Sequence, residues 1–194
     1  MVEVETDIVI WLNQWVSRSE VLDAIVTLIV SDYFVPVTLS LCLFVLWFAT
    51  DHISDRNTTQ KAVLRAMISI GFANLAVLII NENFFRERPF INHSLNLSLF
   101  YPPVDPSFPA NPAALSFTIA SAIRSTNQRV GWLMYALASA WCVSRIFVGV
   151  FYPSDILAGA IIGIIVSNVV GIGLQRIDPV TMLVLRTARK FHLA

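Results

Sequence analysis

Hydrophobic residues fall in long apolar runs along this chain, and short polar connections separate the runs. The four strongest runs cover residues 33–50, 62–81, 131–150 and 156–174. Each is close to the roughly 20 residues that an α-helix needs to cross a bilayer core of about 30 Å. A further apolar run, 112–123, is too short to cross alone, and we expect it to pack inside a bundle. The pattern therefore predicts an all-α, polytopic transmembrane bundle of five helices.

The first 30 residues follow a different pattern. Apolar and polar groups alternate over residues 8–30, and Trp11 and Trp15 share one helical face because they are four residues apart. This is typical of short helices that lie in the headgroup region and are anchored by indole rings. The alternative is that residues 22–30 begin the first span. Insertion of this N-terminal part would raise the number of spans to six.

Composition agrees with a membrane protein. Of the 194 residues, 56% are hydrophobic and only 13% are charged, whereas a soluble domain is about one quarter charged. The 13 basic and 13 acidic residues leave no net charge, so the chain has no electrostatic footprint for nucleic acid. Cys42 and Cys142 both lie in apolar runs, which gives neither a disulfide framework nor a metal cluster. We expect no cofactor and no metal.

Lysine and arginine are distributed unevenly between the two ends of the predicted bundle. Nine of the thirteen lie in or beside the connections 51–61 and 124–130 and the C-terminal segment. The positive-inside rule places that end in the cytoplasm and the long loop 82–110 outside. We therefore expect an integral protein of a bacterial inner membrane. Its single domain has three parts: interfacial helices 1–30, a transmembrane bundle 33–175 and a basic amphipathic tail 176–194 on the cytoplasmic surface.

Two glycines in the last apolar run indicate close helix packing. Gly159 and Gly163 form a G-x-x-x-G pattern, in which the small residues let two helix backbones approach each other. We favour packing within one bundle over a dedicated dimer face.

Three ionisable residues lie at the outer ends of the predicted spans. Arg88 follows the second span, Arg145 lies near the end of its helix, and Asp155 begins the last span. Charges within or beside a span are costly and point to a functional site. Paired guanidinium groups are natural ligands for phosphate. The alternative is a structural ion pair between Asp155 and an arginine that closes the outer end of the bundle.

Three short motifs occur in order along the second half of the chain. The first is Arg88-Pro89, and the second is Phe108-Pro109 ahead of an Ala-rich segment. The third is Ser144-Arg145 with Asp155 ten residues beyond the arginine. In order and spacing they resemble the three signatures of the type-2 phosphatidic acid phosphatases. These are lipid phosphate phosphatases related in fold to vanadium haloperoxidases.

The chain departs from these signatures where the family has its reacting groups. Asn81 stands in place of a lysine, and Asn111 and Pro112 stand in place of Gly-His in the second signature. Phe151 stands where the third signature has histidine. The resemblance implies that this last histidine attacks phosphorus, that the other protonates the leaving group, and that the aspartate orients the nucleophile. Phenylalanine and proline supply neither a nucleophile nor a transferable proton.

Few other side chains in the sequence could replace the two missing histidines. His93 lies in the outer loop, where a histidine is usually a solvated surface group. His52 lies in a connection assigned to the cytoplasm and His192 in the tail. The thiol of Cys142, within an apolar span, is a poor nucleophile.

The sequence therefore predicts a degenerate family member with a vestigial site. Our first hypothesis is a catalytically inactive accessory or structural subunit, whose partners are the bilayer and other membrane-protein subunits. Two alternatives are a binder of an anionic phospholipid and a working lipid phosphate or pyrophosphate phosphatase with unconventional residues. In all cases we expect Asp155 within salt-bridge distance of Arg145 or Arg88, and Phe151 in place of the nucleophile. No residue is assigned as catalytic, Arg88 and Arg145 are the phosphate-binding candidates, and the site comprises Asn81, Arg88, Asn111, Pro112, Ser144, Arg145, Phe151 and Asp155.

Overall fold

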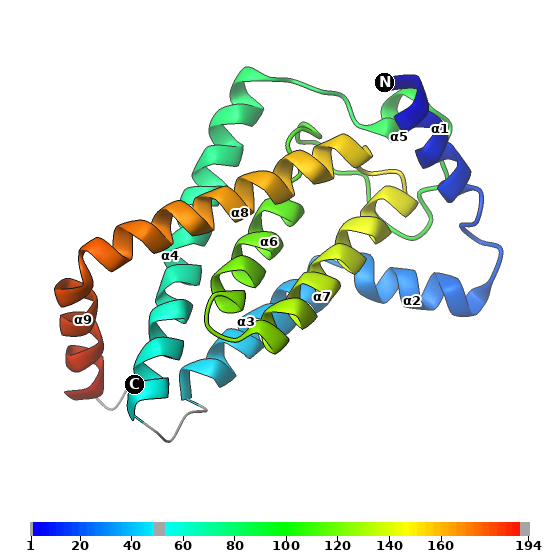
Figure 1. Cartoon of the computed structure of the whole chain (residues 1–194). Helices are drawn as coiled ribbons and strands as arrows, with labels where there is room; N and C mark the ends of the chain where they lie inside the picture. The colour runs from blue at the N-terminus through cyan, green and yellow to red at the C-terminus, as the bar shows by residue number, and fades with distance from the viewer. Residues whose placement is uncertain (1, 49–52, 191–194) are drawn as a thin grey trace.

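The computed structural model describes residues 2–48 and 53–190, which fold into a bundle of α-helices (Figure 1). The described part contains no β-strand. Its helices are α1 (Val2–Asn13), α2 (Glu20–Val30), α3 (Phe34–Phe48), α4 (Ile53–Asn83), α5 (Pro89–Asn92), α6 (Asn111–Arg124), α7 (Gln128–Phe147), α8 (Pro153–Arg176) and α9 (Asp178–Lys190).

The short helix α6 forms the centre of the bundle. It packs against α8, α7 and α4, and most of its residues are buried. Its sequence suits this position, because alanine, serine and threonine leave room for three neighbouring helices. Pro112 lies in the first turn, where its missing N–H has no intrahelical partner to lose. The short apolar run at 112–123 therefore folds inside the bundle, as its length predicted.

Three described helices are long and apolar enough to cross a membrane: α4 from Arg56 onward, α7 and α8. The pair α2 and α3 qualifies only as one broken span, bent by 54°, which gives up to four. The 15 residues of α3 and the 14 of α6 rise only about 22 and 21 Å at 1.5 Å per residue. The predicted number of five spans is therefore not confirmed, because two apolar runs form helices shorter than the bilayer core. The end of the run 33–50 lies outside the described residues.

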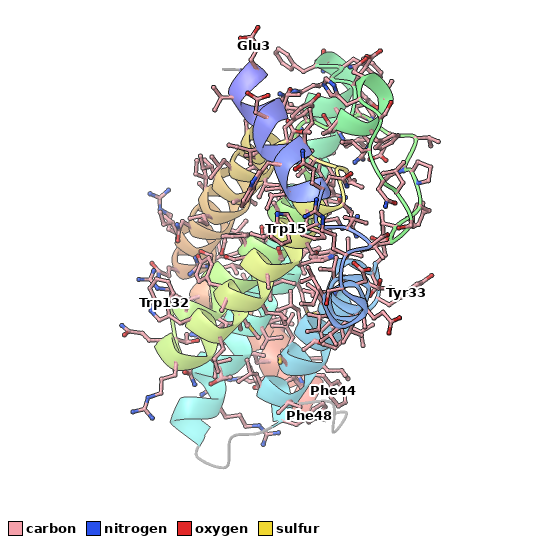
Figure 2. All side chains as sticks on the ribbon, turned by 90° about the vertical axis from the view of Figure 1, so that its right-hand side faces the viewer. Glu3, Trp15, Tyr33, Phe44, Phe48 and Trp132 are labelled. Carbon is pink, nitrogen blue, oxygen red and sulfur yellow. The ribbon has the colours of Figure 1, made fainter. Side chains whose placement is uncertain are left out.

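Large apolar side chains cover the outside of this bundle. Figure 2 shows Tyr33 at its margin and Phe44 and Phe48 at the lower end of α3. These three side chains and Trp132 are between 46% and 79% exposed. So much exposed aromatic and aliphatic surface suits contact with lipid rather than water. The described fold is that of an integral membrane protein.

The two glycines of the G-x-x-x-G pattern mark the closest approach of α8 to α6. A Cβ atom at Gly159 would lie 2.3 Å from the carbonyl oxygen of Ala110. One at Gly163 would lie 2.3 Å from the carbonyl oxygen of Ala114. The hydroxyl of Thr118 donates a hydrogen bond to the Gly163 carbonyl at 3.1 Å. The pattern is therefore used for packing inside one chain, which is the alternative that we favoured.

Replacing Gly163 by alanine is expected to lower the free energy of unfolding by about 1–3 kcal/mol, because the new methyl group meets backbone atoms that cannot move aside. Gly173→Ala is a matched control on the same helix, since a Cβ there meets nothing within 4 Å. The control is expected to stabilise α8 by about 0.5–1 kcal/mol through helix propensity. Unfolding midpoints in one detergent measure both effects. Equal shifts in the two variants would contradict the assigned contact.

Candidate active site

The three predicted charges gather at the end of the bundle where α4 ends and α7 and α8 meet (Figure 1). Arg88 immediately precedes α5, Arg145 lies in the last turn of α7, and Asp155 lies in the first turn of α8. They are only 2%, 3% and 0% exposed. Arg88 lies within electrostatic range of the other two. The fold therefore brings together the three side chains that the sequence placed at one end.

Backbone carbonyl groups hold the guanidinium of Arg88 in place. Its Nε donates to the Asp105 carbonyl at 2.8 Å, and its Nη1 donates to the Val150 carbonyl at 3.2 Å. Its Nη2 lies 3.0 Å from the Asp105 carboxylate. Burial lowers the pKa of Arg88, and the charge of Asp105 opposes that shift. The Phe151 ring lies beneath this group, with its centroid 4.4 Å from the guanidinium carbon.

Arg145 has a carboxylate and two aromatic rings around it. Its Nη2 pairs with Asp32, which also accepts a hydrogen bond from the Tyr101 hydroxyl at 2.6 Å. The guanidinium carbon lies 4.4 Å from the ring centroid of Phe100 and 5.2 Å from that of Trp141. Its Nε is buried and has no hydrogen-bond partner among the described residues. The group therefore has a donor that a further ligand would satisfy.

Asp155 pairs with Arg86, so the expected pairing with Arg88 or Arg145 is wrong. One carboxylate oxygen lies 2.6 Å from Arg86 Nη1, and the other accepts the Tyr152 N–H at 3.0 Å at the start of α8. Arg86 also binds Glu5 at 3.0 Å. Burial lowers the pKa of Arg86, but Glu5 and Asp155 together outweigh this and leave it raised. Arg88 pairs with Asp105 instead, and Arg145 pairs with Asp32.

The remaining predicted residues lie on the helices that meet here but do not bind the arginines. Asn81 lies near the end of α4, and Asn111 and Pro112 begin α6. The Oδ1 atoms of Asn81 and Asn111 are buried without a partner in the described part of the chain. The hydroxyl of Ser144 donates to the Trp141 carbonyl at 2.7 Å. In the part that the structure describes, no hydrogen bond or ion pair joins these four residues to an arginine.

Sequence reasoning missed the groups that neutralise the arginines, namely Glu5, Asp32 and Asp105. Asp32 is a lone charge between the apolar helices α2 and α3. The cost of a charge at a membrane boundary could have singled it out. Glu5 and Asp105 carry no such signal, because their segments have no pattern that relates them to an arginine. Only the tertiary fold brings them to the site.

Of the four residues considered as replacements for the missing histidines, the structure describes two. His93 is partly buried just after α5, and Cys142 is buried in α7. His52 and His192 lie outside the described residues. Within the described ranges, no three His, Cys, Asp or Glu side chains are grouped so as to hold a metal ion.

Comparison with known proteins identifies the family. The model of the PAP2 superfamily matches residues 62–177, a stretch that contains Arg88, Arg145 and Asp155. The chain belongs to the PAP2 superfamily. The resemblance to lipid phosphate phosphatases is thereby confirmed at the level of the family.

Several bacterial proteins resemble this PAP2 chain. The undecaprenyl-diphosphatase BcrC of Bacillus subtilis is 30% identical over 151 residues, which cover 77% of this chain and 74% of the relative. The bacitracin transport permease protein BcrC of Bacillus licheniformis is 32% identical over 128 residues, covering 66% and 60%. The crystal structure of Aquifex aeolicus LpxE has a TM-score of 0.65 at 25% identity, over 84% of this chain and 92% of that one.

A second solved structure supports the fold alone. It is the transmembrane PAP2-type phosphatidylglycerolphosphate phosphatase of Bacillus subtilis, with a TM-score of 0.62 at 18% identity. The match covers 90% of this chain and 86% of that one.

These relatives contradict the prediction of a catalytically inactive accessory subunit. The relative from Bacillus subtilis that is 30% identical is named as an undecaprenyl-diphosphatase, and nothing in the comparisons indicates inactivity or an accessory role. The prediction rested on what Pro112 and Phe151 cannot do. The absence of histidine at these two positions removes two reacting groups and does not exclude a reaction that uses the other polar groups of the site.

Proposed function

We propose that this PAP2 protein is a membrane phosphatase that hydrolyses a lipid diphosphate, with polyprenyl diphosphates as its substrate class. The observation that carries the proposal is the pair of buried guanidinium groups, Arg88 and Arg145, in one cluster. A diphosphate carries several anionic oxygens, and guanidinium groups bind such oxygens in a bidentate manner. The substrate class follows the undecaprenyl-diphosphatase of Bacillus subtilis, to which the chain is 30% identical.

The substrate would take the place of two carboxylates. Asp105 and Asp32 now pair with Arg88 and Arg145, and their side chains are 60% and 38% exposed, so each can shift toward solvent and still remain beside the bound phosphate. Both lie in connecting segments rather than in helices. A phosphate has more charge and more acceptor oxygens than a carboxylate and would compete well for Arg88 and Arg145. The unpartnered Nε of Arg145 would then gain an acceptor.

The reaction would proceed without histidine at positions 112 and 151. We assign the general base to Asp105, because its carboxylate adjoins Arg88 and is the more exposed of the two. Water attacks the terminal phosphorus and passes its proton to this carboxylate. A P–O bond to water forms, the P–O bond to the lipid monophosphate breaks, and the products are inorganic phosphate and the lipid monophosphate. Arg88 and Arg145 stabilise the charge that develops on the phosphoryl oxygens.

Two matched carboxylate substitutions test this assignment. Asp105→Asn is expected to lower kcat about a hundredfold, the usual contribution of a general base. Asp32→Asn removes a competitor for Arg145 and is expected to lower KM several-fold at unchanged kcat. Steady-state kinetics on a polyprenyl diphosphate measures both. Equal changes in kcat for the two variants would contradict the role given to Asp105.

The substrate class is tested by phosphate release from purified protein in mixed micelles. We expect release from a polyprenyl diphosphate to exceed release from phosphatidic acid, because the diphosphate offers oxygens to both arginines at once. Faster release from phosphatidic acid would overturn the proposed substrate class but would still support phosphatase activity. Release from neither lipid would overturn the function itself.

We also propose that the site faces the extracytoplasmic side and that the C-terminus lies in the cytoplasm. The beginning of α4, the turn between α6 and α7, and α9 lie at the other end of the bundle (Figure 1). These segments hold most of the lysine and arginine residues, and the positive-inside rule supports a cytoplasmic place for them. The bilayer is then the main partner of the single membrane domain.

A further inference from the structure

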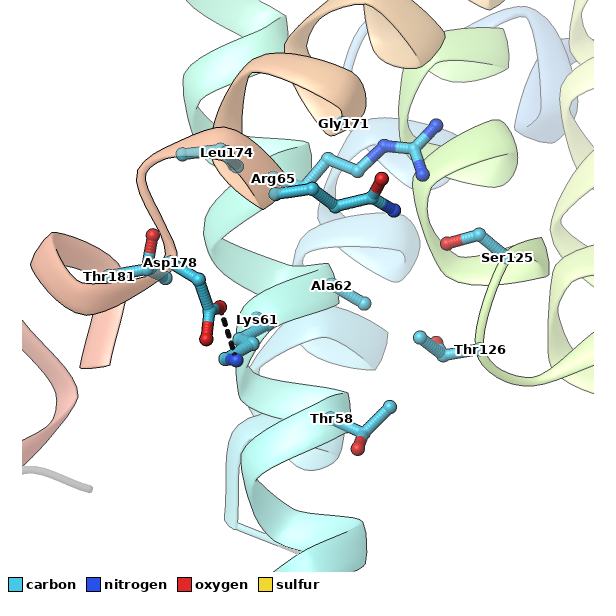
Figure 3. A pocket seen from close by; sticks show the side chains of 11 residues that line it. Thr58, Lys61, Ala62, Arg65, Ser125, Thr126, Gly171, Leu174, Asp178 and Thr181 are labelled. Atoms are coloured by element: carbon cyan, nitrogen blue, oxygen red, sulfur yellow. Dashed lines mark hydrogen bonds and ion pairs between the residues drawn. The ribbon is translucent and has the colours of Figure 1, made fainter.

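A polar cavity of about 370 Å³ opens at the end of the bundle away from Arg88. Its walls come from α4, the end of α8, the turn between α6 and α7, and α9 (Figure 3). Arg65 in its wall precedes the end of α4 at Asn83 by 18 residues, or about 27 Å at 1.5 Å per residue. The cavity is therefore separate from the candidate active site.

Two cations line this cavity and are held in different ways. Lys61 pairs with Asp178, and both side chains are partly exposed. Arg65 donates from Nε to the Ser167 carbonyl at 2.8 Å and from Nη2 to Asn168 Oδ1 at 3.0 Å. These bonds fix one edge of the guanidinium. Its Nη1 has no hydrogen-bond partner among the residues that the structure describes, so an anion could take that position.

The backbone around Arg65 is shaped to fit its guanidinium. A Cβ atom at Gly171 would lie 2.7–2.9 Å from three atoms of that group, so the guanidinium packs directly against the backbone of α8 at this glycine. Ser125 and Thr126 line the wall across the cavity (Figure 3). Each of their hydroxyls now donates to a carbonyl three residues earlier and can rotate to face a ligand. Hydrogen-bond donors therefore surround the cavity, and one carboxylate, that of Asp178, only partly compensates the charge of its two cations.

The surroundings of the cavity favour a lipid over a free ion. Leu174 and Ala62 line its wall beside the polar groups. On the adjoining amphipathic helix α9, Val180, Leu183 and Val184 are between 49% and 63% exposed. This apolar surface would contact the acyl chains of a lipid whose phosphate enters the cavity. Basic pockets between transmembrane helices are a known setting for anionic headgroups.

We propose that this cavity binds the phosphate of an anionic phospholipid, with Arg65 and Lys61 as the charged ligands. The site lies at the opposite end of the bundle from Arg88 and Arg145. It is independent of the proposed reaction, because none of its lining residues takes part in that chemistry.

Native mass spectrometry of the full chain in mild detergent, titrated with phosphatidylglycerol, tests this proposal. We expect one phosphatidylglycerol bound per chain and much weaker retention of phosphatidylcholine. Arg65→Gln and Thr126→Asp are each expected to weaken binding at least tenfold. Thr126 is exposed in a turn, so its variant is expected to fold even where R65Q does not. Arg176→Gln is the matched control, since it removes an exposed charge at the end of α8 outside the cavity and should change binding less than twofold.

The outcomes separate the sources of the phosphate group. Equal retention of phosphatidylglycerol by wild type and T126D would overturn the site. Binding of inorganic phosphate to the chain, with no lipid retained, would assign the cavity to a free anion and overturn the proposal of a lipid ligand. Lipid retention is read directly from mass, so a failure of the phosphatase assay has no bearing on this result.

Discussion

Replacing Arg145 by lysine is expected to lower kcat/KM for a polyprenyl diphosphate about a hundredfold or more. Lysine keeps the positive charge and can still pair with Asp32, so the fold should be retained. It loses the planar fork that binds two phosphoryl oxygens and the contacts with the rings of Phe100 and Trp141. Removal of one oriented donor to a developing oxyanion commonly costs about 10²–10³ in rate.

The control for this variant is Arg18→Lys. Arg18 is exposed, and its guanidinium carbon lies 5.3 Å from the Trp15 ring centroid, so it has a comparable contact outside the site. The same change of side chain there should leave kcat/KM unchanged. If R145K retained activity within twofold of wild type, Arg145 would not be a phosphate ligand.

Replacing Phe151 by histidine is expected to raise kcat about a hundredfold. The Phe151 ring lies directly beneath the Arg88 guanidinium, six residues after Arg145, which is where the resembled signature has its nucleophile. An imidazole at this point would attack phosphorus and divide the reaction into two easier steps. The variant should also accumulate an acid-labile phosphohistidine, which rapid quenching with labelled substrate detects. Wild type should form none.

Phe151→Leu is the matched control for this gain. Leucine keeps the position apolar and has no nucleophilic atom, so its kcat should remain at the level of wild type. Adding Pro112→His to F151H should raise kcat further, because a second imidazole supplies the proton for the leaving group. Equal rates for the histidine and leucine variants would show that residue 151 does not face the phosphate.

Hydropathy was enough to find the helices but not to give their lengths. The runs at 62–81, 131–150 and 156–174 correspond to α4, α7 and α8, and all three pass as candidate spans. The run at 33–50 gave only the 15-residue helix α3, which joins α2 at a bend of 54°. Apolar composition does not say where a chain bends. That depends on turn residues and on packing against neighbours.

The positions of the site charges could be predicted, but their partners could not. A charge at the end of an apolar run is visible in sequence, which singled out Arg88, Arg145 and Asp155. Their partners come from distant segments, as in the pair of Arg145 with Asp32, which are 113 residues apart. Such pairs depend on how helices pack, and no local pattern encodes them. The ion pair of Asp155 with Arg86 likewise depends on helix packing.

The prediction of inactivity failed for a chemical reason rather than a structural one. The absence of histidine at 112 and 151 identifies two groups that cannot react. The described site still contains two buried guanidinium groups and two exposed carboxylates beside them. In the proposed function, these groups bind the phosphate and activate water.

Hydrolysis at the site of Arg88 and Arg145 can be followed by ³¹P NMR of a polyprenyl diphosphate in micelles with purified protein. We expect the two diphosphate signals to decay while lipid monophosphate and inorganic phosphate appear in equal amounts. The double variant R88Q/R145Q should show no decay over the same period. Stable diphosphate signals with wild-type protein, or equal decay with wild type and the double variant, would contradict the claim that Arg88 and Arg145 form a working phosphatase site.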